Sequence, residues 1–186
     1  MKAFTLVETL VATSIIAIAI TAPLFTANRS IIAAQTSSMQ LTASSLAQEG
    51  IEQVRRLRDN EYLAAYQARG TNISDTAWTR FKTNDPLTDV NSIKDCISPN
   101  ICTVDPIASG ATLSKCVGTC QTLYLHSTTG IYSQQSTSGW VKQPYTRTIQ
   151  AFDVSPTDLK VVSTVSWNYH GTDFSIAATL HLTPWQ

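Results

Sequence analysis

The first part of the chain is a long apolar run. Residues 4–27 read FTLVETLVATSIIAIAITAPLFTA and contain one ionisable side chain, Glu8. As an α-helix, this run is roughly 36 Å long at about 1.5 Å per residue, which is enough to cross the hydrocarbon core of a bilayer. It is longer than the ~7–15 apolar residues of a secretory signal peptide. We expect residues 4–27 to form a single membrane-spanning helix, with its N-terminus inside and the rest of the chain outside.

The helical pattern continues beyond the apolar run, over residues 28–66. Apolar or small residues recur at steps of three, four or seven, as on the stripe of an amphipathic helix. The stripe consists of Ile32, Met39, Ala43, Leu46, Gly50, Val54 and Leu57. We expect it to pack on a sheet, with Gly50 permitting a close approach. Pro23 removes a helix hydrogen bond and is expected to kink or locally open the helix.

In residues 121–186 the pattern of apolar and polar residues changes to the two-residue period of β-strands. Residues 159–169 and 174–183 flank the sequence His170-Gly171-Thr172-Asp173, a hairpin signal. In the second of these strands, apolar residues alternate with polar or small ones, so one face is apolar. Further strands are expected at residues 121–127, 131–135 and 145–154. The pattern predicts an α+β fold, in which the long N-terminal helix packs on an antiparallel β-sheet.

Residues 67–120 separate these two patterns and hold most of the turn-forming residues. We expect an irregular connection there, with at most a short helix near residues 76–81. This connection contains all four cysteines of the chain, which are Cys96, Cys102, Cys116 and Cys120. An even, clustered set of cysteines in an exported domain predicts two disulfides. Three pairings are possible, and the local pairing of the first with the second and the third with the fourth is slightly favoured.

Charge and candidate chemistry narrow the functional classes. The 13 basic and 13 acidic residues balance, which argues against a protein whose main task is neutralising phosphate. Arg55, Arg56 and Arg58 could contact DNA, but acidic residues are interleaved with them, so a solvated helix end is the better interpretation.

No nucleophile elbow or glycine-rich phosphate loop is present, and the cysteine spacings differ from those of structural zinc sites. We expect no enzyme activity, no metal site and no cofactor.

The start of the chain closely resembles the cleavage and methylation signal of type IV prepilins. A short basic leader and a small residue, Ala3, precede Phe4-Thr5-Leu6-Val7-Glu8 and the apolar run. The resemblance implies that residues 1–3 are a leader, that a prepilin peptidase cuts between Ala3 and Phe4, and that the new amine of Phe4 is methylated. Glu8 would then pair with the amine of a neighbouring subunit. The family usually has Gly where this chain has Ala3, so we expect cleavage, at a lower rate.

The C-terminal strands, with a Val-x-Trp strand and an ending in Thr-Pro-Trp, resemble those of minor pilins and pseudopilins. The resemblance implies a structural subunit of a type IV pilus or related filament. Its partners would be other pilin subunits, the prepilin peptidase and methylase, an inner-membrane assembly platform, and membrane lipid before assembly. We expect it in the cytoplasmic membrane first, and then in a cell-surface or periplasmic filament. The alternatives are a major pilin, or a pilus-associated adhesion or DNA-binding subunit.

Overall fold

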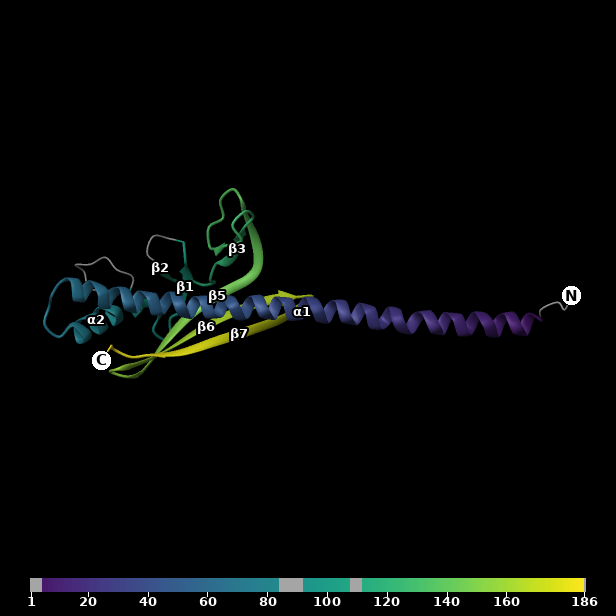
Figure 1. Cartoon of the computed structure of the whole chain (residues 1–186), viewed down its shortest axis with the longest axis horizontal. Coiled ribbons are helices and arrows are strands. Elements are labelled where there is room, and N and C mark those ends of the chain that lie inside the picture. Colours follow the sequence, from purple (N-terminus) through teal and green to yellow (C-terminus); the bar gives the residue numbers. More distant parts are fainter. Residues whose placement is uncertain (1–4, 84–91, 108–111, 186) are drawn as a thin grey trace. The chain divides into compact units, whose positions relative to one another are not determined.

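The computed structural model describes residues 5–83, 92–107 and 112–185. Ala3 and Phe4, the expected cleavage junction, lie outside the described residues. The chain forms two compact units, Met1–Leu41 and Thr42–Gln186. A single helix, α1 (Leu6–Gln67), supplies the described structure of the first unit and continues into the second (Figure 1).

The first unit is the N-terminal part of α1. Helical structure continues on both sides of Pro23, which lies inside the helix. Up to Ile32, every large apolar side chain that the structure describes here is exposed, because no other element of this unit covers it. Examples are Leu10, Ile16, Ile18 and Phe25, whose exposed fractions range from 57% to 71%.

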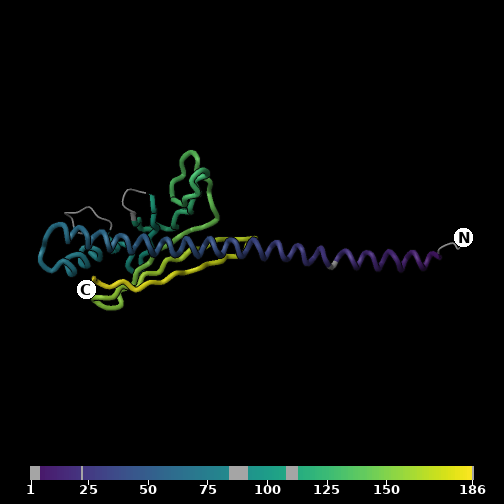
Figure 2. Tube along the Cα trace, viewed as in Figure 1, coloured from purple at the N-terminus to yellow at the C-terminus, as the bar shows by residue number. Residues whose placement is uncertain are grey.

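The second unit contains the rest of α1 and all remaining elements. Its two further helical elements are α2 (Ile73–Lys82) and a short 3₁₀ turn, η1 (Lys94–Cys96). Its described strands are β1 (Cys102–Asp105), β2 (Thr112–Lys115), β3 (Thr122–His126), β4 (Tyr132–Ser133), β5 (Trp140–Ser155), β6 (Asp158–Tyr169) and β7 (Thr172–Leu182). The Cα trace in Figure 2 follows the same path.

The described strands form one antiparallel sheet around β5, the longest of them. On one side β5 pairs with β6, which in turn pairs with β7. On its other side β5 pairs with β1 and β3, which carry the short strands β2 and β4. The predicted α+β fold of a long N-terminal helix and an antiparallel sheet is confirmed.

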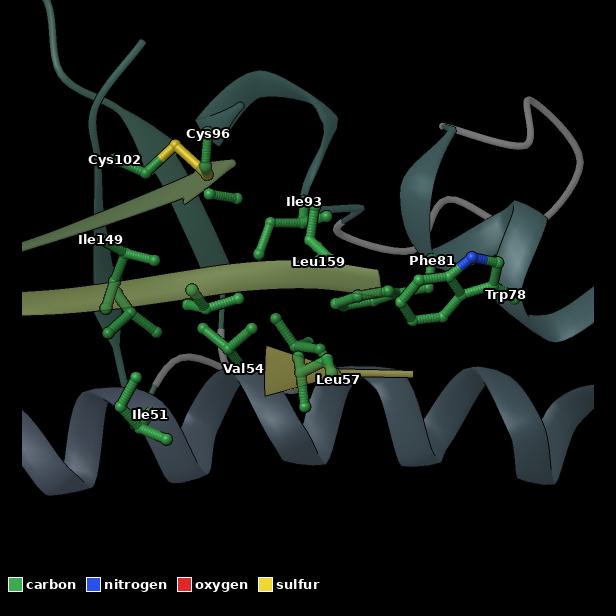
Figure 3. Packing of buried hydrophobic residues seen from close by; sticks show 14 residues of the cluster. Ile51, Val54, Leu57, Trp78, Phe81, Ile93, Cys96, Cys102, Ile149 and Leu159 are labelled. Atoms are coloured by element: carbon green, nitrogen blue, oxygen red, sulfur yellow. A yellow bond between two sulfur atoms is a disulfide. The ribbon is translucent and has the colours of Figure 1, made fainter. Parts of the chain in front are cut away.

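The core lies between α1 and one face of this sheet. From Ala43 onward, the predicted helix stripe is buried, whereas Ile32 is exposed. Ile51, Val54 and Leu57 point from α1 toward side chains of β5, β6 and α2 (Figure 3). A cluster of this kind is the main source of stability for a small domain, since burial removes apolar surface from water.

Gly50 lies where the helix approaches the sheet closely. A Cβ atom at this position would overlap Ser163 Oγ and would lie 3.1 Å from both Arg147 Cδ and Ile149 Cδ1. Only glycine leaves room for these side chains, so the predicted close approach at Gly50 is confirmed.

The structure differs from the sequence-based prediction in residues 67–120. We expected an irregular connection there with at most a short helix near residues 76–81. α2 includes that helix, but the connection also contains the strands β1 and β2. The segments forming β1 and β2 are only four residues long, which is too short for alternation to be recognised against a background of turn formers. They become strands because β5 and β1 offer them hydrogen-bonding edges. β5 likewise begins at Trp140, before the predicted start at residue 145.

Candidate functional site

The N-terminus of α1 carries the residue that the sequence singled out, Glu8. Thr5 precedes the helix, and its hydroxyl oxygen accepts a hydrogen bond from the backbone N–H of Glu8 at 3.3 Å. The Thr5 carbonyl accepts the first helical bond, from Thr9 N–H. Thr5 is therefore the N-cap and Glu8 the third residue of the helix, where the helix dipole favours a carboxylate. The Glu8 side chain is exposed, and none of the described residues donates a hydrogen bond to it.

The hydroxyl groups in the apolar part of α1 are hydrogen-bonded within the helix. Thr9, Thr13, Ser14 and Thr21 each donate a hydrogen bond to a carbonyl three or four residues earlier in the helix. These hydroxyls therefore need no outside partner in an apolar medium. By its length and composition, α1 can cross a membrane. Among the described residues of this segment, Glu8 is thus the polar side chain left without a partner.

A partly buried ion pair joins the domain part of α1 to the sheet. Arg147, in β5, is fully buried, and its guanidinium donates to Glu49 Oε2 at 2.6 Å and to the Leu46 carbonyl at 3.2 Å, both on α1. It also donates to the Val104 carbonyl of β1 at 3.0 Å. One side chain thus joins the helix to two strands. Removing one partner of a buried ion pair leaves an uncompensated charge, which makes such a pair hard to break.

Sequence reasoning missed this ion pair. In β5, the inward positions Tyr145, Arg147, Ile149 and Ala151 alternate with outward ones, and all four are buried. The sequence did contain one sign of it, an arginine at a position that alternates in step with the buried residues of the strand. It is uninformative without the acceptors, because a strand's period does not reveal where a carboxylate from another element lies.

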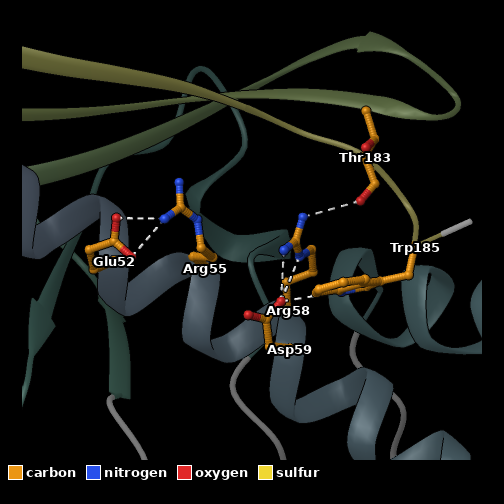
Figure 4. A network of polar contacts seen from close by, with 6 residues as sticks. All are labelled: Glu52, Arg55, Arg58, Asp59, Thr183 and Trp185. Carbon is orange, nitrogen blue, oxygen red and sulfur yellow. Dashed lines mark hydrogen bonds and ion pairs between the residues drawn. The ribbon is translucent and has the colours of Figure 1, made fainter.

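Arg55 and Arg58 each form an ion pair with a carboxylate of the same chain (Figure 4). Arg55 forms an ion pair with Glu52 at 2.7 Å, and Arg58 forms one with Asp59 at 2.8 Å. Arg58 also lies over the ring of Trp185, 5.1 Å from its centre. Arg56 is exposed. Two of the three charges are therefore compensated by neighbouring carboxylates. The segment is not the helix end that we had expected, because α1 continues to Gln67.

The four cysteines form two local disulfides, Cys96–Cys102 and Cys116–Cys120. This is the pairing that the sequence slightly favoured. The first bridge is fully buried and belongs to the core cluster. The second is partly exposed and closes a small loop, in which Val117 is 90% exposed.

The histidines and acidic residues of the described part of the chain are of the types that can ligate a metal ion. No group of three His, Cys, Asp or Glu side chains there could hold a metal ion. His126 packs edge-on against Trp140, and His181 is paired with Asp158 at 2.9 Å. His181 is exposed to solvent.

No protein-family model, no curated protein and no solved structure matches this chain. What the structure itself defines is a class of architecture. The chain has a long N-terminal helix with an exposed apolar stretch. The later part of this helix packs on an antiparallel sheet, and the arrangement is consistent with a pilin-like architecture.

Proposed function

We propose that the protein is a structural subunit, a minor pilin or pseudopilin, of a type IV pilus or related filament. One observation carries the proposal: α1 exists in two environments. Its later part is buried in the domain core, whereas its earlier part, up to Ile32, exposes every large apolar side chain described. Such a surface needs lipid or other apolar helices around it. The prepilin-like sequence before it indicates which proteins would supply them.

The proposed assembly proceeds in three steps. A prepilin peptidase removes residues 1–3, which exposes the amine of Phe4, and a methylase modifies this amine. The chain stays in the cytoplasmic membrane as a single span with its domain outside. An inner-membrane platform then brings subunits together, and their apolar helices pack into a filament core at the cell surface or in the periplasm.

Glu8 gives this assembly its register. A carboxylate in an apolar environment is costly unless it finds a partner, and the described structure offers Glu8 none within its own chain. The Phe4 amine of an adjacent subunit would neutralise it. Because both charges are compensated only when the two helices stand at one relative height, the pair favours one arrangement of neighbouring subunits.

The test is the substitution Glu8→Ala in cells that make the whole assembly machinery. We expect the variant to reach membranes normally but to be depleted in sheared filaments, because the amine of its neighbour loses its partner, at a cost of about 3–5 kcal/mol. Glu8→Gln should be intermediate at best, since an amide cannot neutralise the amine. Asp75→Asn, which removes a carboxylate from α2 instead, is the matched control and should assemble like the wild type.

The sheared filaments also test the proposed cleavage before Phe4 and the methylation of its amine. Intact-mass measurement of filament protein should show a chain that begins at Phe4 and carries a methylated amine. Retention of Met1 in filaments would contradict the proposed cleavage. Normal incorporation of Glu8→Ala would contradict the role given to Glu8.

A further inference from the structure

One long strand of the sheet has a neighbour on one side alone. β7 pairs along its whole length with β6 and with no other strand among those described. The described strands at the other edges, β2 and β4, have four and two residues. A row of unpaired backbone N–H and C=O groups can template a further strand. Proteins usually protect such an edge by shortness, charge, proline or a bulge.

β7 has none of these protections. It is 11 residues long, contains no proline, and keeps its register with β6 without interruption. Its two ionisable side chains, Asp173 and His181, lie near its ends. Each already has a partner on β6: Asn168 Nδ2 lies 2.7 Å from Asp173 Oδ1, and Asp158 pairs with His181. The backbone edge of residues 174–180 therefore carries no charge.

An open groove adjoins this edge. It has a volume of about 410 Å³ and lies between the domain part of α1 and residues 176–180 of β7. On the helix side it is lined by Ser44, Ala47, Gln48, Ile51, Glu52 and Arg55. The small side chains Ser44 and Ala47 leave space that larger residues would fill. As a result, the inward side chains Ile176, Ala178 and Leu180 stay only half-buried.

The charges around the groove define what fits it. Glu52 and Arg55 are paired with each other at 2.7 Å, so the rim contributes no net charge. A charged residue at the centre of an incoming segment would lose water without gaining a partner. Apolar side chains at every second position would enter the groove beside Ile176 and Leu180, while the backbone hydrogen-bonds to β7.

We propose that the free edge of β7 and the adjoining groove form a strand-addition site. It binds an extended, centrally uncharged segment of another protein chain, whose alternate apolar side chains occupy the groove. This site is separate from the exposed apolar part of α1, and the inference does not depend on whether the protein assembles into a filament.

The site can be tested with labelled synthetic peptides. Fluorescence anisotropy measures their affinity for the detergent-solubilised full-length protein. One peptide alternates valine and serine, and a second has the same composition with its valines grouped together. A third alternates but carries a central lysine. We expect the alternating peptide to bind at least about tenfold more tightly than the other two. Hydrogen exchange should show that it protects β7 amides. Equal binding of the three peptides, or protection at β2 or β4 instead, would overturn the proposal.

Substitutions in the protein provide a second test of the same site. Ala178→Lys places a charge in the groove and should weaken binding of the alternating peptide at least about tenfold. Ser166→Lys places the same charge on the exposed face of β6, away from the edge, and should leave binding unchanged. Equal affinity of the two variants would overturn the site. If the protein alone forms a dimer that Ala178→Lys dissociates, a second copy occupies β7, and binding of a foreign strand is refuted.

Discussion

Gly50 shows at the level of a single residue how closely α1 approaches the sheet. Gly50→Ala would improve helix propensity by about 1 kcal/mol, but the new methyl group overlaps Ser163 Oγ. We expect a net loss of about 1–3 kcal/mol in the free energy of unfolding, as for other overpacked cores. Chemical denaturation of the full-length protein in detergent measures it.

A double-mutant cycle isolates the cause. Ser163 Oγ is buried without a hydrogen-bond partner among the described residues, so Ser163→Ala alone should be close to neutral. In that background Gly50→Ala should cost less than half of its cost in the wild type, because the overlapping oxygen is gone. Equal costs in both backgrounds would show that the overlap is not what excludes alanine.

Two phenols, that of the half-buried Tyr132 and that of the buried Tyr145, predict a loss of stability at high pH. Burial raises the pKa of Tyr132 above 10.0, and the neighbouring Tyr145 raises it further. Burial also raises the pKa of Tyr145, partly offset by its hydrogen bond with Thr42. Above about pH 10, the unfolded chain releases these protons while the folded chain retains them, so unfolding becomes more favourable as pH rises.

The comparison of Tyr145→Phe with wild type tests this pH dependence. The free energy of unfolding, followed from pH 8 to pH 11, should fall less steeply in the variant, since one retained proton is gone. Tyr66→Phe, which removes an exposed phenol in the same way, is the control. An unchanged slope in Tyr145→Phe would refute the contribution assigned to that residue.

At the scale of elements, the two disulfides should differ in reactivity. A reductant attacks a sulfur atom directly, so access controls the rate. Cys96 and Cys102 are fully buried, whereas Cys116 and Cys120 bound an exposed loop. Under mild reduction of the folded protein, alkylation followed by peptide mass analysis should find label on Cys116 and Cys120 first. Equal rates of labelling would contradict the buried position of the first bridge.

The bridges should also differ in what they contribute to stability. Both close short loops, for which chain entropy predicts about 2 kcal/mol each. Cys96→Ala with Cys102→Ala additionally removes sulfur atoms from the core cluster, so it should destabilise more than Cys116→Ala with Cys120→Ala. Thermal unfolding of the two double variants measures the difference.

At the scale of the whole molecule, the two units should respond separately to substitution. Ile16 is exposed in the apolar part of α1 and takes no part in the core. Ile16→Arg should reduce the membrane-bound fraction, since an arginine at a helix centre costs about 3 kcal/mol to insert. It should leave the unfolding temperature of the domain unchanged.

Alkaline extraction of membranes, with Ile16→Leu as the control, measures the membrane-bound fraction. An arginine variant that remains bound as firmly as the leucine variant would argue against insertion of this helix. A lowered unfolding temperature of the domain would show that the two units are coupled.

The sequence by itself determined the elements whose signal is local and repeated. The apolar run predicted a membrane-spanning helix, and its helical structure is confirmed. The stripe from Ile32 to Leu57 predicted a buried face, which is buried from Ala43 onward, and the alternation in residues 174–182 predicted the last strand. The hairpin turn was predicted as well. His170 and Gly171 both have positive φ values, which an X-Gly turn favours. Each of these signals repeats over many residues or occupies a single turn, so no distant contact is needed to detect it.

Only the tertiary structure decided the features that depend on distant partners. β1 and β2 are strands because neighbouring edges accept them, and Arg147 can be buried because Glu49 and two carbonyls from other elements reach it. The open edge of β7 likewise follows from where the sheet ends. A residue's own sequence neighbourhood records its helical or strand period, but hydrogen bonds and ion pairs form between groups far apart in the chain. Their energies depend on the folded arrangement that brings those groups together.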